Sequence, residues 1–346
     1  MLKNTDRLAI FMEDNLKSDY GKMGFGIMRY SENPIACVID SQNAGRTVHD
    51  VNGLPFDIPI VRDIAAAIKM QAKVLVLGIA PSGGKFPKDW EAPVVEGLRQ
   101  GMHLVNGLHD DLNAKFGNLL QGSNQWIWDI RKPAFIPNIG TAKAAELDNT
   151  RILLVGTDMA VGKMTTGLEL YRWIKAQGVN TSFVATGQIG ISITGDGIPL
   201  DAFKVDHAAG AVETMVLKEK NSQVIFIEGQ GSLLNPGSTA TLPLMRGSCP
   251  THLILCHRAD LTSLRKVSTI KIPDLSSFIE LNESMASVCG AFPRPITLGI
   301  ALNTSRLAPN LVSGYIEMLK EKTGLLVTDV VRNGPQELGE KIIGLI

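Results

Sequence analysis

Short apolar runs rich in β-branched residues alternate along this chain with longer stretches of helical periodicity. The runs that predict strands are Arg7–Met12, Ile35–Ile39, Ile58–Val61, Lys73–Ile79, Met102–Val105, Arg151–Val155, Thr181–Ala185, Gln223–Ile227, His252–Leu255, Pro295–Leu302 and Leu325–Val330. The stretches that predict helices are Val61–Met70, Trp90–Gln100, Lys163–Gln177, His207–Lys220 and Asn310–Thr323. Such alternation is typical of parallel α/β structure, and continuous apolar strands are typical of sheets covered by helices on both faces.

The pattern also indicates two domains. Residues Lys115–Asn138 show no periodicity, and Pro137–Thr150 precedes a strand that enters a glycine-rich loop. A chain of 346 residues is long enough for about two domains of roughly 150 residues each. We therefore expect a first domain at residues 1–143 and a second at residues 144–346.

Composition excludes several classes of protein. The hydrophobic fraction is 45% and the charged fraction 20%, which is ordinary for a folded chain and unlike a disordered one. Lys plus Arg total 34 and Asp plus Glu total 34, so the formal charge is zero. That balance argues against nucleic-acid binding through bulk charge and against a polybasic membrane tether. The expected partners are a small-molecule substrate and further copies of the chain in a homo-oligomer.

The cysteines and the amino terminus favour a cytoplasmic location. The four cysteines form no CxxC pair, which argues against a disulfide framework or a structural zinc site. Charged residues interrupt the amino-terminal segment before a signal-peptide core is complete. The longest apolar runs, such as Lys73–Ala80, are far shorter than the roughly 20 residues of a membrane helix.

The clearest motif is Arg151–Thr166, RILLVGTDMAVGKMTT, in which a strand runs through a glycine-rich turn into a helix. Backbone N–H groups of such a loop, the helix N-terminus and a lysine together bind phosphate oxygens. Lys163 is the expected phosphate lysine, and we expect it to face solvent. The residues expected to bind the phosphate-bearing ligand are Gly156, Thr157, Asp158, Gly162, Lys163, Met164, Thr165 and Thr166.

This loop departs from the usual GxxxxGK[ST] pattern at two positions. Thr157 stands where the pattern has glycine, and Met164 stands where it has a hydroxyl. Thr165 or Thr166 can replace that hydroxyl, so the magnesium ligand, and any metal site, is left unassigned. The alternative interpretation is an ordinary strand-to-helix turn with a surface lysine.

A second motif places a carboxylate at a strand end. The run Gln223–Leu234, QVIFIEGQGSLL, delivers Glu228 just past an apolar strand. An acidic residue there can hold a cation or act as a base, or it can simply cap the next helix. Gln230 and Ser232, which follow among glycines, are expected to contact substrate.

Two further segments of the second domain carry candidate residues. Val184–Asp201 is glycine-rich and contains Gln188, so it is either a loop that lets backbone approach a ligand or a flexible surface hairpin. Asp206 and His207 open a predicted helix, where they either cap it or form a catalytic pair.

In the first domain, polar segments follow three predicted strands, at Asp40–Thr47, Ala80–Lys85 and Asn106–His109. Ligands of open α/β sheets bind outside the carboxyl ends of the strands. Gly83, Gly84 and Lys85 are therefore candidates for holding an anion, and Arg46 for pairing with a carboxylate.

Several of these segments together resemble one family. GTDMAVGKMTT, ATGQIGISITGDGIPLD, VDHAAGAVE, EGQGSLLNPGSTATLPL and GIALNT resemble a P-loop family long labelled a domain of unknown function. The loop alone also resembles that of dethiobiotin synthetase. VIDSQNAGRT, GIAPSGGKFP and GMHLVNGLH extend the resemblance to the first domain. It implies an N-terminal Rossmann-like domain and a C-terminal P-loop NTPase-like domain.

The resemblance also implies an activity. Some members resemble D-glutamate N-acetyltransferases, which move acetyl from acetyl-CoA to the amino group of D-glutamate. On that interpretation the candidate bases are Glu228, Asp206 and His207, and Arg46, Lys85 or Arg258 would bind the acidic substrate. The alternatives are an ATP-dependent ligase or kinase of dethiobiotin-synthetase type, which uses Mg²⁺, and a non-catalytic nucleotide sensor.

Overall fold

A computed structural model of the chain describes residues 2–81 and 83–346. Contacts between residues divide it into two units. The first unit holds the chain up to Ala134 together with Gln188–Ala202, and the second holds Phe135–Gly187 together with Phe203–Ile346. A boundary at residues 143/144 would lie inside the second unit, and a single boundary does not represent the inserted segment.

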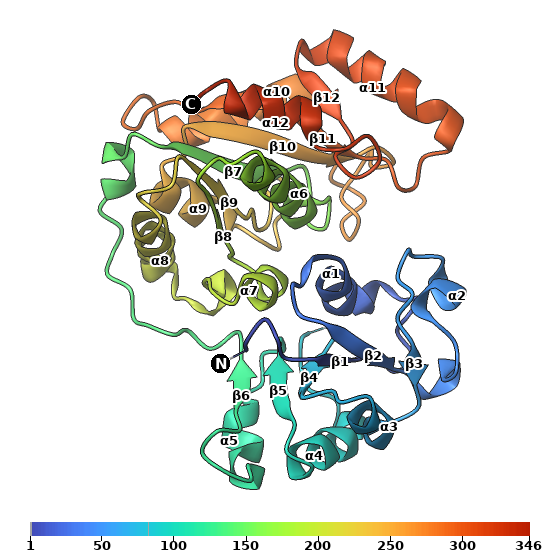
Figure 1. Cartoon of the computed structure of the whole chain (residues 1–346). Coiled ribbons are helices and arrows are strands. Elements are labelled where there is room, and N and C mark those ends of the chain that lie inside the picture. Colours follow the sequence, from blue (N-terminus) through green and yellow to red (C-terminus); the bar gives the residue numbers. More distant parts are fainter. Residues whose placement is uncertain (1, 82) are drawn as a thin grey trace. The chain divides into compact units, whose positions relative to one another are not determined.

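The first unit is built on a parallel sheet in the order β3-β2-β1-β4-β5-β6 (Figure 1). Its strands are β1 (Leu8–Phe11), β2 (Ile35–Ile39), β3 (Ile60–Val61), β4 (Val74–Leu77), β5 (His103–Asn106) and β6 (Ile127–Asp129). Its helices are α1 (Lys22–Tyr30), α2 (Val48–Asn52), α3 (Ile64–Lys69), α4 (Glu91–Arg99), α5 (Leu112–Phe116) and α7 (Gln188–Thr194). Side-chain caps fix where helices begin, since Thr47, Asp63 and Asp111 each accept a backbone N–H of the first turn.

The second unit has its own parallel sheet, in the order β12-β11-β10-β7-β9-β8. Its strands are β7 (Thr150–Gly156), β8 (Thr181–Val184), β9 (Val224–Ile227), β10 (His252–Arg258), β11 (Ile296–Asn303) and β12 (Leu326–Thr328). Its helices are α6 (Lys163–Ala176), α8 (Val205–Lys218), α9 (Thr241–Ser248), α10 (Leu275–Ser287), α11 (Pro309–Thr323) and α12 (Gln336–Ile343). The expected parallel α/β architecture is confirmed in both units.

The core of the second unit explains where its phosphate loop lies. Alternate residues of β7, β9 and β10 pack with α6 and α12 in one apolar cluster. This packing fixes β7 between β10 and β9, so the loop that follows β7 emerges beside the ends of both neighbouring strands.

The periodicity did not predict the helices α1, α2, α5, α9, α10 and α12, and two further segments differ from their predicted structure. The stretch Lys115–Asn138, which lacks periodicity, contributes the short edge strand β6. The glycine-rich stretch Val184–Asp201 forms neither an open loop nor a hairpin, because its centre is the helix α7. That helix buries Gly190, Ile191 and Ser192 and packs on α1 in the first unit.

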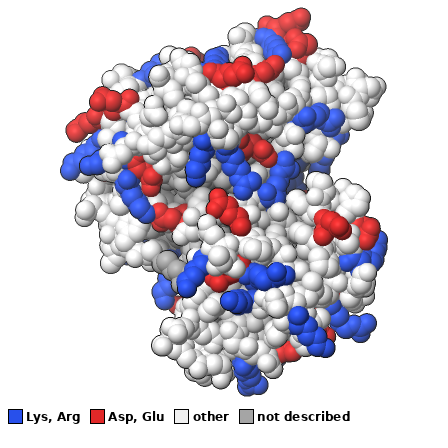
Figure 2. Space-filling model, in the orientation of Figure 1, with Lys and Arg blue, Asp and Glu red and all other residues white. Residues whose placement is uncertain are grey.

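Surface charge agrees with the balanced composition. Basic and acidic side chains both occur across the face shown in Figure 2. Within the described residues, no helix combines the length and the apolar character that crossing a bilayer requires.

Candidate functional site

The loop between β7 and α6 has the backbone that its glycines permit. Gly162, immediately before α6, has φ +113°, which a residue with a Cβ rarely adopts. A Cβ on Gly156 would lie 2.8 Å from Val161 Cγ2 and 3.0 Å from Lys163 Nζ. The two glycines therefore shape the turn and leave room for the lysine side chain beneath it.

Lys163 folds back into this loop rather than facing solvent, so that expectation was wrong. Its side chain is buried, with 7% of the residue exposed, and Nζ donates to the Asp158 carbonyl oxygen at 2.9 Å. The stem lies against the backbone of Gly156 and Gly229, where added Cβ atoms would meet it. Burial lowers the pKa of Lys163 to about 8, opposed by the nearby Cys256, Asp158 and Glu228. Among the described residues, the buried amine therefore bonds a neutral backbone oxygen rather than a carboxylate, which favours an arriving anion.

Asp158 ties the phosphate loop to two other loops. Its Oδ1 accepts from Asn235 Nδ2 at 2.7 Å, and its Oδ2 accepts from the Arg265 backbone N–H at 2.9 Å. Both carboxylate oxygens of this buried side chain are therefore used in holding the loops that follow β9 and β10.

Thr157 is also fixed from β10. Its hydroxyl lies 2.9 Å from Nδ1 of His257, and both residues are buried. Burial lowers the pKa of His257 to about 4, so the ring is neutral near pH 7. The larger residue at this glycine position is accommodated because the neighbouring strand supplies a hydrogen-bond partner.

The hydroxyls after Lys163 have different surroundings. Thr166 is buried and bonds the thiol of Cys256, whose pKa burial raises to about 11. Met164 and Thr165 are partly exposed at the start of α6. Of the two threonines, Thr165 is therefore the one whose hydroxyl stays accessible beside the loop.

Glu228 lies in the same unit, just past β9. Its Oε2 accepts backbone N–H groups from Thr186 at 2.9 Å and from Gly187 at 3.1 Å. Gln230 adds a side-chain hydrogen bond to the carboxylate. Burial raises the pKa of Glu228 to about 7, against the lowering effect of these bonds and of Lys163. A carboxyl with that pKa can take up and release a proton near neutrality.

Gln230 and Ser232 shape the loop that follows β9. A Cβ on Gly187 would lie 2.7 Å from Gln230 Nε2 and 3.3 Å from Glu228 Oε1, so the amide, carboxylate and glycine lie together. Ser232 is buried, and its hydroxyl accepts the Leu234 N–H at 3.2 Å. Gln230 therefore belongs to the Glu228 cluster, whereas Ser232 holds a turn.

Asp206 and His207 lie in the first turn of α8. Nδ1 of His207 is 3.1 Å from the Pro137 carbonyl oxygen, so this ring anchors the segment that precedes β7. Asp206 is exposed. Among the described residues, the recorded hydrogen bonds of this pair do not reach Glu228 or the phosphate loop.

In the first unit, the structure brings four predicted residues to the ends of β4 and β5. Gly84 accepts the His109 N–H at 2.8 Å, and Gly83 and Lys85 flank it; Ser82 of this loop lies outside the described residues. Gln188 lies beside Gly107: a Cβ added to Gly107 would be 3.4 Å from Gln188 Cγ.

Arg46 lies elsewhere in the first unit, after β2. Its Nη2 donates to the Asp50 carbonyl oxygen at 2.6 Å, next to the capping box of α2. β1 lies between β2 and β4 in the sheet, so Arg46 follows a different part of the sheet edge from Lys85.

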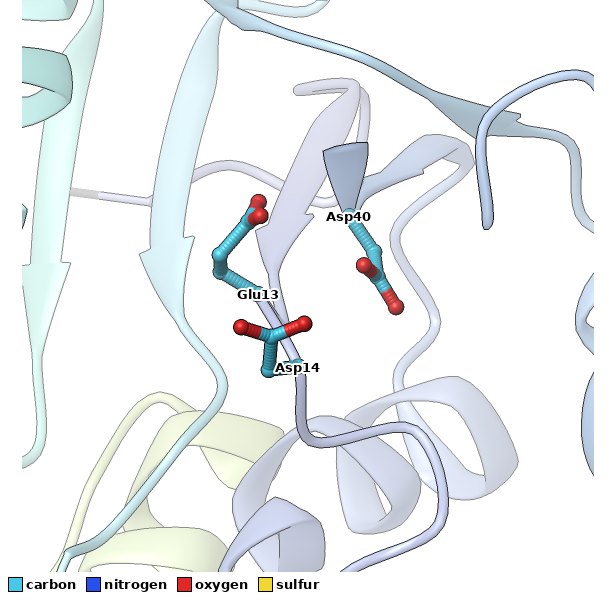
Figure 3. A group of neighbouring side chains, drawn as sticks. All are labelled: Glu13, Asp14 and Asp40. Atoms are coloured by element: carbon cyan, nitrogen blue, oxygen red, sulfur yellow. The ribbon is translucent and has the colours of Figure 1, made fainter. Parts of the chain in front are cut away.

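Sequence reasoning missed an acidic group in the first unit. Glu13 and Asp14 lie just past β1 and Asp40 just past β2, with ligand oxygens within 4.8 Å of one another (Figure 3). Glu13 accepts the N–H and hydroxyl of Ser41, and Asp40 accepts from Gln42 and Asn43. Through these bonds Glu13 and Asp40 support the turn after β2.

Asn235 and Arg131 were missed as well, and so was the role of His257 in supporting the phosphate loop. Asn235 and His257 support the phosphate loop from outside the motif, and no spacing in the sequence links them to it. Arg131 follows β6, the strand that the sequence pattern did not predict. Recognising that strand would have placed Arg131 at the same sheet edge as Lys85.

Comparison with known proteins gives a consistent result over most of the chain. A family described as a domain of unknown function, DUF1611_C, P-loop domain, matches residues 138–339. The companion DUF1611_N Rossmann-like domain matches residues 41–133.

Individual proteins match over similar lengths. A protein of Pseudoalteromonas sp. named D-glutamate N-acetyltransferase is 36% identical over 78% of this chain and 81% of its own. One of the same name from Tritonibacter scottomollicae is 34% identical over 77% of this chain and 80% of its own. The crystal structure of a DUF1611 family protein from Anabaena variabilis is 45% identical and has a TM-score of 0.94, covering 98% of this chain and 100% of that one.

Proposed function

The chain belongs to the DUF1611 family, and from that premise we propose that it is an N-acetyltransferase that moves acetyl from acetyl-CoA to the amino group of an acidic amino acid such as D-glutamate. The names of the two relatives support the reaction and the acceptor. The observation that carries the proposal is that one unit holds both a buried phosphate-loop lysine and a buried carboxyl, Glu228, that accepts two backbone N–H groups and whose pKa burial raises to about 7.

The phosphate loop is the proposed binding site for the donor. Coenzyme A carries a pyrophosphate and a ribose phosphate, and a helix N-terminus with glycine-shaped backbone binds such groups. On binding, Lys163 exchanges the Asp158 carbonyl oxygen for a phosphate oxygen, a charge-assisted partner.

The hydroxyls favour a donor that needs no magnesium. In the usual loop, the residue after the lysine supplies a hydroxyl to Mg²⁺, whereas here it is Met164. The Thr166 hydroxyl is engaged by Cys256 inside the core. Thr165 keeps an accessible hydroxyl in this turn, so it is Met164, the residue directly after the lysine, that favours coenzyme A over Mg²⁺-ATP as the phosphate-bearing ligand.

Glu228 is the proposed base. Its Oε1 takes a proton from the acceptor ammonium while Thr186 and Gly187 hold Oε2. The freed amine nitrogen attacks the thioester carbonyl carbon, the C–S bond breaks, and the coenzyme A thiolate leaves with the second proton that the nitrogen loses on becoming an amide. The products are the N-acetyl amino acid and coenzyme A. The N–H groups of Gly229 or Gly231, next in the chain, are the proposed donors to the oxyanion.

The test is an assay of thiol release from acetyl-CoA with D- and L-forms of glutamate and aspartate, with and without ATP and Mg²⁺. We expect acceptor-dependent release that ATP and Mg²⁺ do not increase. Release that requires ATP would support the ligase alternative, and no turnover with any acidic amino acid would contradict the proposed reaction.

Glu228→Gln tests the base. Removal of a general base costs about 10²–10⁴ in rate, so turnover falls by that factor while the affinity for coenzyme A stays within about threefold. Steady-state kinetics and calorimetry measure the two quantities. If turnover is unchanged, Glu228 has a structural role and Asp206 or His207 is the next candidate.

A further inference from the structure

Arg131 presents a fixed guanidinium at the end of the edge strand β6. Its Nε donates to the Gly107 carbonyl oxygen at 2.8 Å, and its Nη1 pairs with Asp201. Only 15% of the side chain is exposed. Among residues 2–81 and 83–346 these two bonds use two of the five N–H donors of the fork, so its orientation is set while donors remain.

The neighbouring strands bring further polar groups to the same place. The His109 ring lies against Gly84, where a Cβ could not fit, and Gly84 has φ +63°. Burial and the charge of Arg131 lower the pKa of His109, which places the two side chains in one electrostatic environment. Lys85 follows Gly84 directly, and Gln188 lies beside the Gly107 that anchors Arg131.

The ion pair with Asp201 shows that this guanidinium binds a carboxylate. Asp201 belongs to the inserted segment of the first unit, and 48% of its side chain is exposed. A half-exposed carboxylate gains less from its ion pair than a buried one, because water competes for the carboxylate. A ligand carboxylate that uses two N–H groups of the fork is a stronger partner and can replace it.

We propose that Arg131, with His109 near it, binds a carboxylate of a small dicarboxylic ligand, and that Asp201 occupies the guanidinium when the ligand is absent. The identification of that ligand as the acidic amino acid acceptor rests on the proposed function. The binding site itself, made wholly from residues of the first unit, does not.

The experiment measures binding of D-glutamate and of glutarate to the full-length protein by calorimetry, without acetyl-CoA, and then the KM for each substrate. Arg131→Ala is expected to weaken binding of both ligands and to raise the KM for D-glutamate by about tenfold or more, the usual effect of losing a charged hydrogen bond. The KM for acetyl-CoA stays within about twofold. Arg131→Lys, which keeps the charge and loses the fork, gives an intermediate loss.

Asp201→Asn gives the opposite sign. Removing the competing carboxylate is expected to tighten binding of both ligands a few-fold, whereas a purely structural Asp201 would weaken it or leave it unchanged. Arg62→Ala is the matched control, because Arg62 is an exposed arginine just after β3, at the other edge of the same sheet. Melting temperatures of all variants show whether the fold is retained.

Each remaining outcome counts against the proposal. These are wild-type protein that binds neither ligand, Arg131 variants with wild-type affinity, an Asp201→Asn variant that binds no more tightly, or an equal loss in Arg62→Ala. If the wild type binds D-glutamate through Arg131 but transfers no acetyl group, the proposed function fails and this binding site stands.

Discussion

Lys163 and Glu228 are buried ionisable groups whose pKa values are shifted in opposite directions from their ordinary values, so that the two values lie close together. Burial is the largest cause for each, lowering the lysine to about 8 and raising the glutamate to about 7. Their mutual attraction is the smallest contribution in both cases, so the fold holds two charges at a net cost. Such opposed shifts are typical of groups that bind or exchange protons, because a purely structural pair would be stabilised by its own attraction.

Lys163→Met tests the phosphate loop at this scale. Methionine keeps most of the apolar stem that packs on Gly156 and Gly229, so the fold is retained. Losing the charged contact is expected to weaken coenzyme A binding by about 10- to 150-fold, from roughly 1.5–3 kcal/mol. Calorimetry measures the affinity and circular dichroism the fold. Lys320→Met, on the surface of α11, is the control, and an unchanged affinity in Lys163→Met would exclude the phosphate-loop role.

At the scale of elements, the sequence predicted those strands and helices that have a clear hydrophobic period or carry a motif. The buried run of β7 and the start of α6 follow from apolar residues and from Gly162-Lys163. By contrast, β6 has three residues and α7 has seven, one of them Gly190, so neither is long enough to show a period.

The supporting residues of the site were unpredictable for a different reason. His257 and Asn235 reach the loop across 100 and 77 positions of sequence, and those contacts depend on strand order. The inserted segment, between Gly187 and Phe203, was missed because its glycines indicate a loop but do not show which unit that loop joins. Lys163 was expected in solvent because a sequence does not show how deeply a loop is covered.

The packing of α8 on α9 gives a prediction about stability. Gly247 of α9 lies against α8, where a Cβ would meet Ala209 O and would come within 2.6 Å of Val212 Cβ. Gly247→Ala is therefore expected to destabilise the protein by about 1–3 kcal/mol, as overpacking usually does.

The control for this change lies in α11. Gly314→Ala adds a methyl group in open space on an exposed helix, so it should stabilise by about 0.5–1 kcal/mol. Chemical unfolding of the two variants measures both values. An equal effect of the two substitutions would mean that the close approach of α8 and α9 does not limit stability.

For the whole molecule, the same architecture is used twice. Each unit has a parallel sheet, and in each the polar residues gather where neighbouring strands end. This is the expected place for ligands in open α/β sheets, since backbone groups and loop side chains are available there. The two proposed sites, the phosphate loop in one unit and Arg131 in the other, follow that rule independently.

Burial of the Glu228 carboxyl should lower the free energy of unfolding of the protein at the pH values where this group is ionised. Glu228 has a folded pKa of about 7, above its ordinary value of 4.5. Its contribution to stability is therefore complete below pH 4.5 and is lost as the pH rises to about 7. In Glu228→Gln the side chain stays neutral, and its Oε1 can still accept both N–H groups that now bind Oε2.

The variant that loses turnover should consequently be the more stable one at neutral pH. We expect the melting temperatures of wild type and Glu228→Gln to be similar near pH 4.5, to separate as the pH rises, and to differ by a constant few degrees above pH 7. Differential scanning calorimetry across this range, in the absence of ligand, measures the difference. A difference that does not change with pH would show that the carboxyl is not held at a raised pKa, and it would remove the physical basis for assigning Glu228 as the base.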